Sequence, residues 1–386
     1  MRSFDYLDKT NVIFGAGRFV ELPNIVGKYG NICLLVTVPS EGVLEPIFEQ
    51  AKQMLEENDI KVFHFDEVVP NPTREMINKG IGFAKNCGIN VIVGIGGGSS
   101  MDTAKAISIG LKNDGDIWDY RVVEGKPIKN DGLPVILTPT TSGTGSHVTQ
   151  AAVLTNTEER FKSAVCKPDF FPAAAIVDPV LMRSLPQIVR AATGFDAFTH
   201  LFEAYINTNG NAYTDLLALD GMSRVIKNLG NAVYGEYDIE VLEQLAWADT
   251  LAGYCITNCG TVLPHGIAMA ISGNFPRISH GEALAVVYPH FMEFTFPNSE
   301  FKFARVAHMF NPGTASLTTG EAAEKSCEEI LKLLKHLRLN KKLSDFGLHS
   351  SDIEKIAEDT FKLPDYMSNP RIPNKREVYE IMINCL

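Results

Sequence analysis

Two residues that can bind a metal ion or move a proton lie four positions apart in the stretch GFDAFTHLFEAY, residues 194–205. In a helix, Asp196 and His200 would project from the same face. The rest of the stretch is largely apolar and predicts a buried helix, in which an unpaired carboxylate or imidazole is costly. The two side chains could hydrogen-bond to each other, or both could bind a metal ion.

Two further histidines stand in the segment LPHGIAMAISGNFPRISHGEALAVVYPHF, residues 263–291. His265 and His280 lie at or near predicted helix starts. Together with Asp196 and His200 they supply one carboxylate and three imidazoles, which is a suitable ligand set for Fe(II) or Zn(II). We expect structural or surface roles for five other histidines, which are His64, His290, His308, His336 and His349.

Two glycine- and hydroxyl-rich turns could bind a dinucleotide. The first, GIGGGSSMDTAKAI (94–107), follows an apolar strand and opens a helix for which Ser99 is a good N-cap. The free N–H groups of such a helix start suit a pyrophosphate. The second, TPTTSGTGSHVT (138–149), also follows a strand, and open α/β sheets bind nucleotides at such strand ends. A third stretch, GAGRFV (15–20), looks more like the usual fingerprint but has too short a strand before it.

The elements that position these residues differ between the two halves of the chain. The first half alternates strands with helices and predicts a parallel sheet covered by helices on both faces. After residue 182 helical periodicity takes over, so we expect an α/β domain over 1–182 and an all-helical domain over 183–386. The predicted strands are 32–38, 61–65, 90–96, 133–139 and 174–179, and the predicted helices of the second half are 189–207, 212–229, 240–258, 264–272, 281–294, 300–309, 320–338 and 351–363.

Composition excludes several classes of protein. The net charge of −11 disfavours nucleic-acid binding, and no apolar run is long enough to span a membrane. The N-terminal residues carry charges where a signal peptide needs an apolar stretch. Seven scattered cysteines fit neither a zinc ribbon nor a disulfide scaffold. We therefore expect a cytoplasmic protein with reduced thiols.

The chain resembles the iron-containing (group III) alcohol dehydrogenases over nearly its whole length. The segments that carry the resemblance, in the family's order, are GGGSSMDTAKAI, PTTSGTGS, ATGFDAFTHLFEAY, LPHGIA and HGEALAVVYPHFMEF. The resemblance implies a dehydroquinate synthase-like architecture, in which a dinucleotide-binding α/β domain and an all-α domain enclose a cleft. It also implies a homodimer or a higher homo-oligomer.

The family's functional residues can be carried over position by position. The resemblance implies that Asp196, His200, His265 and His280 hold the metal, with iron expected and zinc possible. The implied contacts to NAD or NADP are Asn71, Gly97, Gly98, Ser99, Asp102, Thr140, Thr141, Thr144 and Lys162. Glu203 lies one turn beyond His200 and could orient a metal ligand, or it could have a surface or helix-stabilising role.

Three positions depart from the common family pattern. Met269 stands where many members have a further histidine, and His147 stands where many have glutamate. We expect both to line the pocket, with His147 or water replacing the missing proton relay, because methionine cannot carry a proton. Val38 stands where NAD-preferring relatives have an aspartate that repels a 2′-phosphate, so we expect NADPH to be accepted. Glu41 is the nearest acid that could restore a preference for NAD.

The function that the resemblance implies is hydride transfer between a primary or secondary alcohol and NAD(P), with a small-molecule alcohol or aldehyde as substrate. One alternative is a metal- and NAD-dependent lyase related to dehydroquinate synthase, whose phosphate-sugar substrate would require a cluster of Lys and Arg near the metal. A second alternative is a non-catalytic protein that binds metal and nucleotide.

Overall fold

A six-stranded parallel sheet forms the first half of the protein. The computed structural model describes residues 3–235 and 238–386. The strand order is β1-β8-β5-β4-β2-β3, and every neighbouring pair is parallel. The strands of this sheet are β1 (Asn11–Phe14), β2 (Ile32–Val36), β3 (Lys61–Phe65), β4 (Val91–Gly96), β5 (Val135–Pro139) and β8 (Ala174–Val177).

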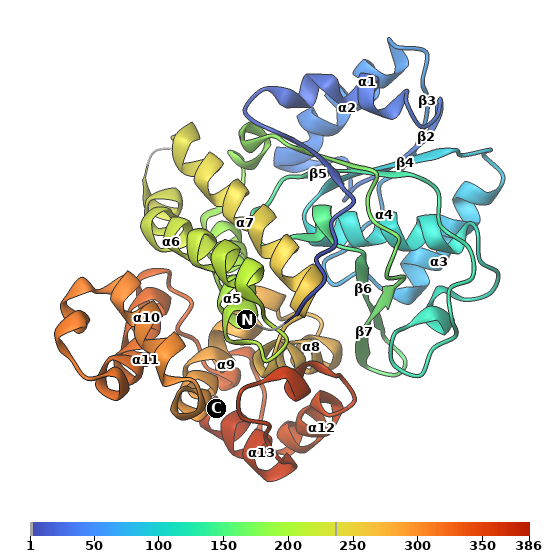
Figure 1. Cartoon of the computed structure of the whole chain (residues 1–386). Coiled ribbons are helices and arrows are strands. Elements are labelled where there is room, and N and C mark those ends of the chain that lie inside the picture. The colour runs from blue at the N-terminus through green and yellow to red at the C-terminus, as the bar shows by residue number, and fades with distance from the viewer. Residues whose placement is uncertain (1–2, 236–237) are drawn as a thin grey trace.

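Helices cover both faces of this sheet, as predicted (Figure 1). Side chains alternate along a strand, so the apolar residues of β2 enter two different cores. Cys33 and Leu35 pack with α1 (Leu22–Val26) and α2 (Glu45–Glu56). Leu34 and Val36 enter the core formed with α3 (Arg74–Lys85) and α4 (Gly98–Gly110). Burial on both faces is why these strands read as continuous apolar runs.

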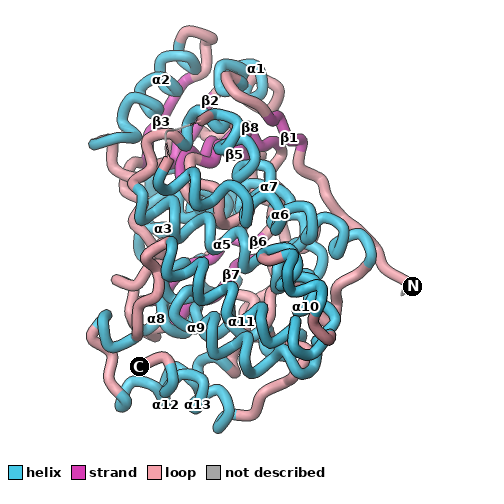
Figure 2. The backbone as a smooth tube through the Cα atoms, turned by 90° about the vertical axis from the view of Figure 1, so that its left-hand side faces the viewer, coloured by secondary structure: helices cyan, strands magenta, loops and turns pink. Residues whose placement is uncertain are grey.

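The second half is helical, as predicted. Its helices are α5 (Gln187–Ile206), α6 (Ala212–Tyr234), α7 (Ile239–Cys259), α8 (Leu263–Asn274), α9 (His280–Thr295), α10 (Glu300–Phe310), α11 (Thr319–His336), α12 (Ser350–Thr360) and α13 (Lys375–Asn384). Most of the sheet strands lie at one end of the molecule and α12 and α13 at the other (Figure 2). None of the described helices is both long and apolar enough to cross a membrane. The last strand ends at Val177 and α5 begins at Gln187, so the boundary at residue 182 stays a prediction.

The structure adds elements that the sequence did not predict. A two-stranded antiparallel hairpin of β6 (Ala151–Asn156) and β7 (Phe161–Cys166) lies between the two halves, where β6 contacts α4 and β7 contacts α8. The short strand expected before GAGRFV is β1, at the edge of the sheet, and the last helix α13 was also missed. A capping box between Asn374 and Glu377 was the available signal for α13.

Candidate metal centre and nucleotide cleft

The central helix α5 carries the first two predicted ligands into the interior. Asp196 is 3% exposed, and His200 is also buried. The helix packs closely against α6, because a Cβ atom at Gly194 would lie only 2.2 Å from Leu229. The spacing of four residues places both side chains on one face, and His200 Nδ1 lies 3.7 Å from Asp196 Oδ1.

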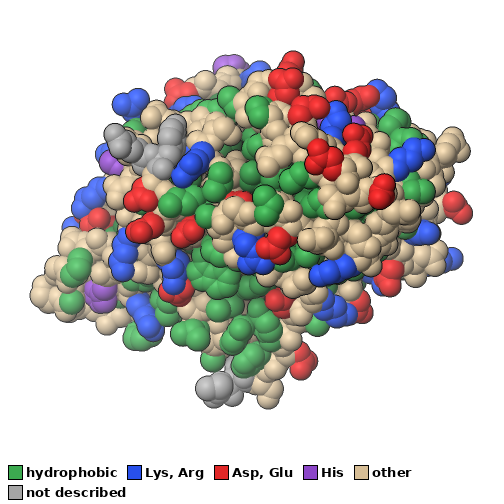
Figure 3. Space-filling view, turned by 90° about the horizontal axis from the view of Figure 1, so that it is seen from above, with side chains coloured by type: hydrophobic (Ala, Val, Ile, Leu, Met, Phe, Trp, Pro, Cys, Tyr) green, Lys and Arg blue, Asp and Glu red, His purple; other side chains and the backbone are tan. Residues whose placement is uncertain are grey.

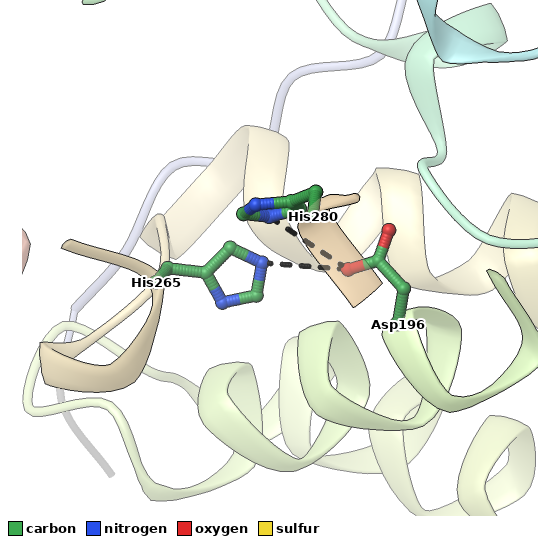
Figure 4. A group of neighbouring side chains, drawn as sticks. All are labelled: Asp196, His265 and His280. Atoms are coloured by element: carbon green, nitrogen blue, oxygen red, sulfur yellow. Dashed lines mark ion pairs between the residues drawn. The ribbon is translucent and has the colours of Figure 1, made fainter. Parts of the chain in front are cut away.

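The other two predicted ligands come from the starts of neighbouring helices. Gly260, with φ +75°, ends α7, and Pro264 stands in the first turn of α8, which carries His265. His280 is the first residue of α9. The Nε2 atoms of His265 and His280 lie 3.7 and 4.0 Å from Asp196 Oδ1, and the three side chains point toward one another (Figure 4). His200 Nε2 lies 2.9 Å from His265 Nε2, so the structure brings all four predicted ligands together.

The unmatched polar atoms of this group fit a divalent cation. Asp196 Oδ1 is buried and has no hydrogen-bond partner among the described residues. The Nε2 atoms of His265 and His280 lie 3.7 and 4.0 Å away, which is too distant for hydrogen bonds but fits ligands around one point. A cation between them would satisfy the carboxylate oxygen and the nitrogen lone pairs together. One carboxylate with imidazoles suits Fe(II) or Zn(II).

Two hydrogen bonds orient the imidazoles. His265 Nδ1 donates to Glu203 Oε1 at 2.7 Å, and His200 Nδ1 donates to the carbonyl of Gly143 at 3.1 Å. A carboxylate and a carbonyl have no hydrogen to donate, so each Nδ1 atom must carry the proton. The Nε2 atom of each ring therefore keeps its lone pair for a metal. Glu203 is fully buried and also accepts a hydrogen bond from the Val262 amide, so the surface alternative for Glu203 is wrong.

Charge at the centre favours a cation. Burial by itself raises the pKa of Asp196, but the imidazoles around it lower that pKa to about 2. Burial likewise lowers the pKa of His265, yet Glu203 and Asp196 outweigh this effect and raise it to about 10. A metal ion at His265 Nε2 therefore competes with a proton.

The two predicted nucleotide turns lie side by side at the carboxyl ends of β4 and β5, where Gly96 pairs with Pro139. The prediction that Ser99 caps α4 is wrong, because the N-cap residue is Gly97 and the helix begins at Gly98. Gly97 has no side chain that could cap α4, which leaves the first N–H groups of this helix available for a phosphate. A Cβ atom at Gly98 would lie 2.7 Å from the Thr144 side chain, so glycine permits the close approach of the two turns.

The backbone N–H groups of the third glycine-rich stretch are already hydrogen-bonded within the protein. The amides of Gly17 and Phe19 donate to the two carboxylate oxygens of Asp178 at 3.0 and 2.9 Å. These N–H groups would otherwise be the ones to hold a phosphate. This agrees with the short strand before GAGRFV, which argued against a phosphate site there.

Polar side chains connect the nucleotide turns to the metal group. Lys162 Nζ donates to Asn71 Oδ1 at 2.8 Å, and Asn71 Nδ2 donates to the Pro276 carbonyl in the loop that leads to His280. Lys162 is buried, and this burial lowers its pKa to about 8. Asp102 accepts hydrogen bonds from the Ser146 hydroxyl and the Val153 amide, at 2.6 and 3.0 Å.

One cavity of about 480 Å³ joins the two groups of predicted residues. It is lined by the four predicted metal ligands and by Asn71, Gly98, Ser99, Asp102, Thr144, Lys162 and Met269. The residues Gly97, Thr140, Thr141 and Val38 are not among its lining. Thr141 lies directly behind Gly97, and Val38 follows β2, two residues beyond its end.

The expectation that His147 lines this cavity is wrong. His147 is fully buried in the short helix Ser146–Val148, and its Nε2 lies 3.0 Å from the Thr250 hydroxyl. Burial, with a further contribution from Lys105, lowers its pKa to about 3. A neutral ring outside the cavity cannot exchange protons with a substrate there. Met269 does line the cavity, as expected.

Sequence reasoning missed Asp249, which holds the second nucleotide turn. Asp249 Oδ1 accepts the Gly145 amide at 2.7 Å, and Gly145 belongs to the same turn as Gly143, whose carbonyl orients His200. The turn thus joins the metal group to the nucleotide side. A single aspartate inside the apolar helix α7 gave no signal that could reveal this contact in advance.

A nucleotide turn and a metal group that open into one cavity are what a metal-dependent, nicotinamide-linked oxidoreductase requires. The chain belongs to the iron-containing alcohol dehydrogenase family. The family model "Iron-containing alcohol dehydrogenase" matches residues 9–179, and "Fe-containing alcohol dehydrogenase family, C-terminal" matches residues 190–386. The protein is therefore an alcohol/aldehyde oxidoreductase that acts on CH–OH groups.

Similar proteins cover almost the whole chain. The 1,3-propanediol dehydrogenase of Klebsiella pneumoniae is 32% identical over 98% of both chains. The NAD-dependent methanol dehydrogenase of Bacillus methanolicus is 32% identical over 88% of both chains. The crystal structure of an archaeal halo-thermophilic alcohol dehydrogenase from a Red Sea brine pool superposes with a TM-score of 0.93, at 34% identity and full coverage of both chains.

Proposed function

We propose that this protein oxidises a primary or secondary alcohol and catalyses the reverse reduction by hydride transfer between the substrate carbon and NADP or NAD. The observation that carries the proposal is the single cavity that Asp196 and His265 share with Ser99 and Lys162. Hydride passes directly between two carbon atoms, so substrate and nicotinamide must meet in one enclosed space.

We propose that Asp196, His200, His265 and His280 hold the metal, with Fe(II) as the ion and Zn(II) as the alternative. When bound, the ion supplies Lewis-acid polarisation of the substrate oxygen. The protein's part is to orient the ligands. Glu203 holds His265, and the Gly143 carbonyl holds His200, so that both rings aim Nε2 at the same point.

For the cofactor, we propose that the N–H groups at the start of α4 bind the pyrophosphate and that Lys162 binds the ribose-nicotinamide end. NADPH is accepted because Val38 presents no carboxylate to a 2′-phosphate. The Ser40 hydroxyl has no partner among the described residues and can donate to that phosphate. The exposed side chain of Glu41 is the competing influence in favour of NAD.

For the proton, we propose a path through water. Met269 lines the cavity where many relatives place a histidine, and a thioether cannot relay a proton. His147, the other candidate from the sequence, lies outside the cavity. Residues of both halves of the chain line the cavity, and water within it would take the proton from the substrate oxygen.

The charge of the cavity favours this function over the lyase alternative. A phosphate-sugar substrate would call for several basic side chains, but Lys162 is the single Lys or Arg among the described residues that line the cavity. Arg277 instead donates to the Phe346 carbonyl.

A homo-oligomer and a cytoplasmic location are further proposals. Figure 3 shows hydrophobic side chains gathered near the middle of the face seen from above. Exposed apolar patches of this kind are typical of protein interfaces, which supports an oligomer. The cytoplasmic location rests on the scattered free cysteines.

The test is an assay of the purified, metal-loaded protein with NADH or NADPH and a panel of aldehydes, following the absorbance of the reduced cofactor. Oxidation of the cofactor that depends on both the aldehyde and the metal supports the proposal. Absence of turnover with every aldehyde and both cofactors contradicts it.

A further inference from the structure

The cavity is also lined by polar residues of the helical half that belong neither to the metal group nor to the nucleotide turns. Asp365 opens the short helix Asp365–Ser368 and lines the cavity together with Thr257 and Thr261. The Thr261 hydroxyl donates to Asp365 Oδ1 at 2.5 Å, which fixes the position of the carboxylate. No described residue donates a hydrogen bond to the other oxygen, Oδ2, of this partly buried side chain. The buried hydroxyl of Thr257 has no hydrogen-bond partner among the described residues.

This carboxylate lies beside the metal group. A Cβ atom at Gly266, the residue after His265, would lie 3.4 Å from Asp365 Cβ. Burial is the main cause of the raised pKa of Glu203, and the negative charge of Asp365 raises it further. The two carboxylates are therefore close enough to interact electrostatically. All of these residues belong to the helical half, whereas Gly98 and Ser99 approach from the sheet. Asp365 therefore lines the cavity from the helical half, beside the metal group.

Apolar side chains make up much of the cavity wall on the helical side. Ile256, Leu363, Pro364 and Met269 line the same cavity. Among the described lining residues, the other carboxylates are Asp196 in the metal group and Asp102, which the Ser146 hydroxyl and the Val153 amide already bind. A carboxylate in an apolar wall gains most from a ligand group that donates a hydrogen bond to it, and it is penalised by an apolar or anionic group.

We propose that Asp365 is a specificity-determining residue that selects alcohols and aldehydes whose far end carries a hydrogen-bond donor, either a second hydroxyl or a primary ammonium. Plain alkyl alcohols are poorer substrates because they leave Asp365 without a partner. Alcohols that carry a carboxylate are the poorest, because two anions would face each other. The inference rests on the proposed function, since it assigns a substrate class to the same cavity.

The experiment compares substrates of matched length with the metal-loaded full chain and its preferred cofactor. The α,ω-diols HO–(CH2)n–OH are paired with the alkanols HO–(CH2)n–CH3 for n from 2 to 5, and the corresponding ω-amino alcohols and ω-hydroxy acids are added. We expect the kcat/KM of the diol to exceed that of its alkanol at least about tenfold at the best length, because the site's acceptor is otherwise unpaired. Amino alcohols follow the diols.

Substitutions then assign the preference to the side chain. Asp365→Leu should reverse it, so that the alkanol becomes the better substrate. Asp365→Asn should keep part of the diol preference, lose the ammonium preference and improve the use of hydroxy acids. Glu358→Gln removes an exposed carboxylate of α12 and should leave every ratio unchanged. Each comparison is a ratio within one preparation, so it does not depend on the fraction of protein that is folded or metal-loaded.

The outcomes separate the two proposals. Alkanol oxidation without a diol preference at any length overturns the role of Asp365 and leaves the proposed function intact. The same diol-to-alkanol ratio in wild type and Asp365→Leu also overturns it. Absence of turnover with all substrates and both cofactors overturns the proposed function, and the inference fails with it.

Discussion

Glu203 Oε1 accepts a hydrogen bond from His265 Nδ1 at 2.7 Å, in the fully buried interior of the helical half. The bond fixes the tautomer of His265 and directs its Nε2 toward Asp196. We expect Glu203→Gln to weaken metal affinity about 10- to 100-fold, because the neutral amide holds the ring less firmly and makes it less basic. Competition with a fluorescent chelator measures the change.

The control for this prediction is Glu293→Gln. Glu293 lies near His290 on α9, at 3.3 Å, and does not line the cavity. Its substitution should leave metal affinity unchanged. Equal metal affinity in Glu203→Gln and wild type would show that Glu203 has no part in orienting the ligand.

The pH–rate profile should not depend on His147. Its pKa is lowered to about 3, so the ring is neutral throughout the range in which the enzyme is assayed, and it lies outside the cavity. We expect His147→Gln to lower kcat modestly, if at all, and to keep both limbs of the profile at the same pH. Loss of one limb in this variant would restore His147 as the proton relay.

Cofactor affinity should fall as the pH rises through about 8. Burial lowers the pKa of Lys162 to that value, so its ammonium group is charged below pH 8 and neutral above it. The positively charged form binds the anionic cofactor more tightly than the neutral form does. We therefore expect the Kd of the cofactor to rise several-fold between pH 7 and 9. Lys162→Arg remains charged over this range, so its Kd should stay flat. A wild-type Kd that is also flat would contradict the role of Lys162.

Cofactor choice should follow position 38. We expect a kcat/KM for NADPH at least equal to that for NADH with one aldehyde, because neither Val38 nor Ser40 repels a 2′-phosphate. Val38→Asp should shift the ratio toward NADH by tenfold or more, through repulsion of the phosphate and a hydrogen bond to the ribose. A wild-type ratio well below one would show that the inference from Val38 is wrong.

The grouping of the four proposed metal ligands could be predicted because part of its signal is local. Asp196 and His200 share a helix face through their spacing, and the family segments placed His265 and His280 beside them. The parallel sheet was equally accessible, because strands buried on both faces leave uninterrupted apolar runs.

Tertiary contacts account for most of what the sequence could not show. Nothing local distinguishes His147, which is buried behind the second nucleotide turn, from Thr144, which faces the cavity three residues earlier. Asp365 lies about a hundred residues from His265 along the chain, and only the packing of α8 against the segment after α12 brings them together. The hairpin β6–β7 was missed because its strands, although mostly buried, carry polar residues that interrupt the apolar pattern.

The central claim is that one divalent metal ion is held by Asp196, His200, His265 and His280. The most direct measurement is the metal content per chain of purified wild type and His265→Ala, each loaded with Fe(II) under anaerobic conditions, with circular dichroism to confirm folding. We expect about one ion per wild-type chain, and a folded His265→Ala chain that has lost both metal and dehydrogenase activity. Full metal occupancy in folded His265→Ala would contradict the assignment.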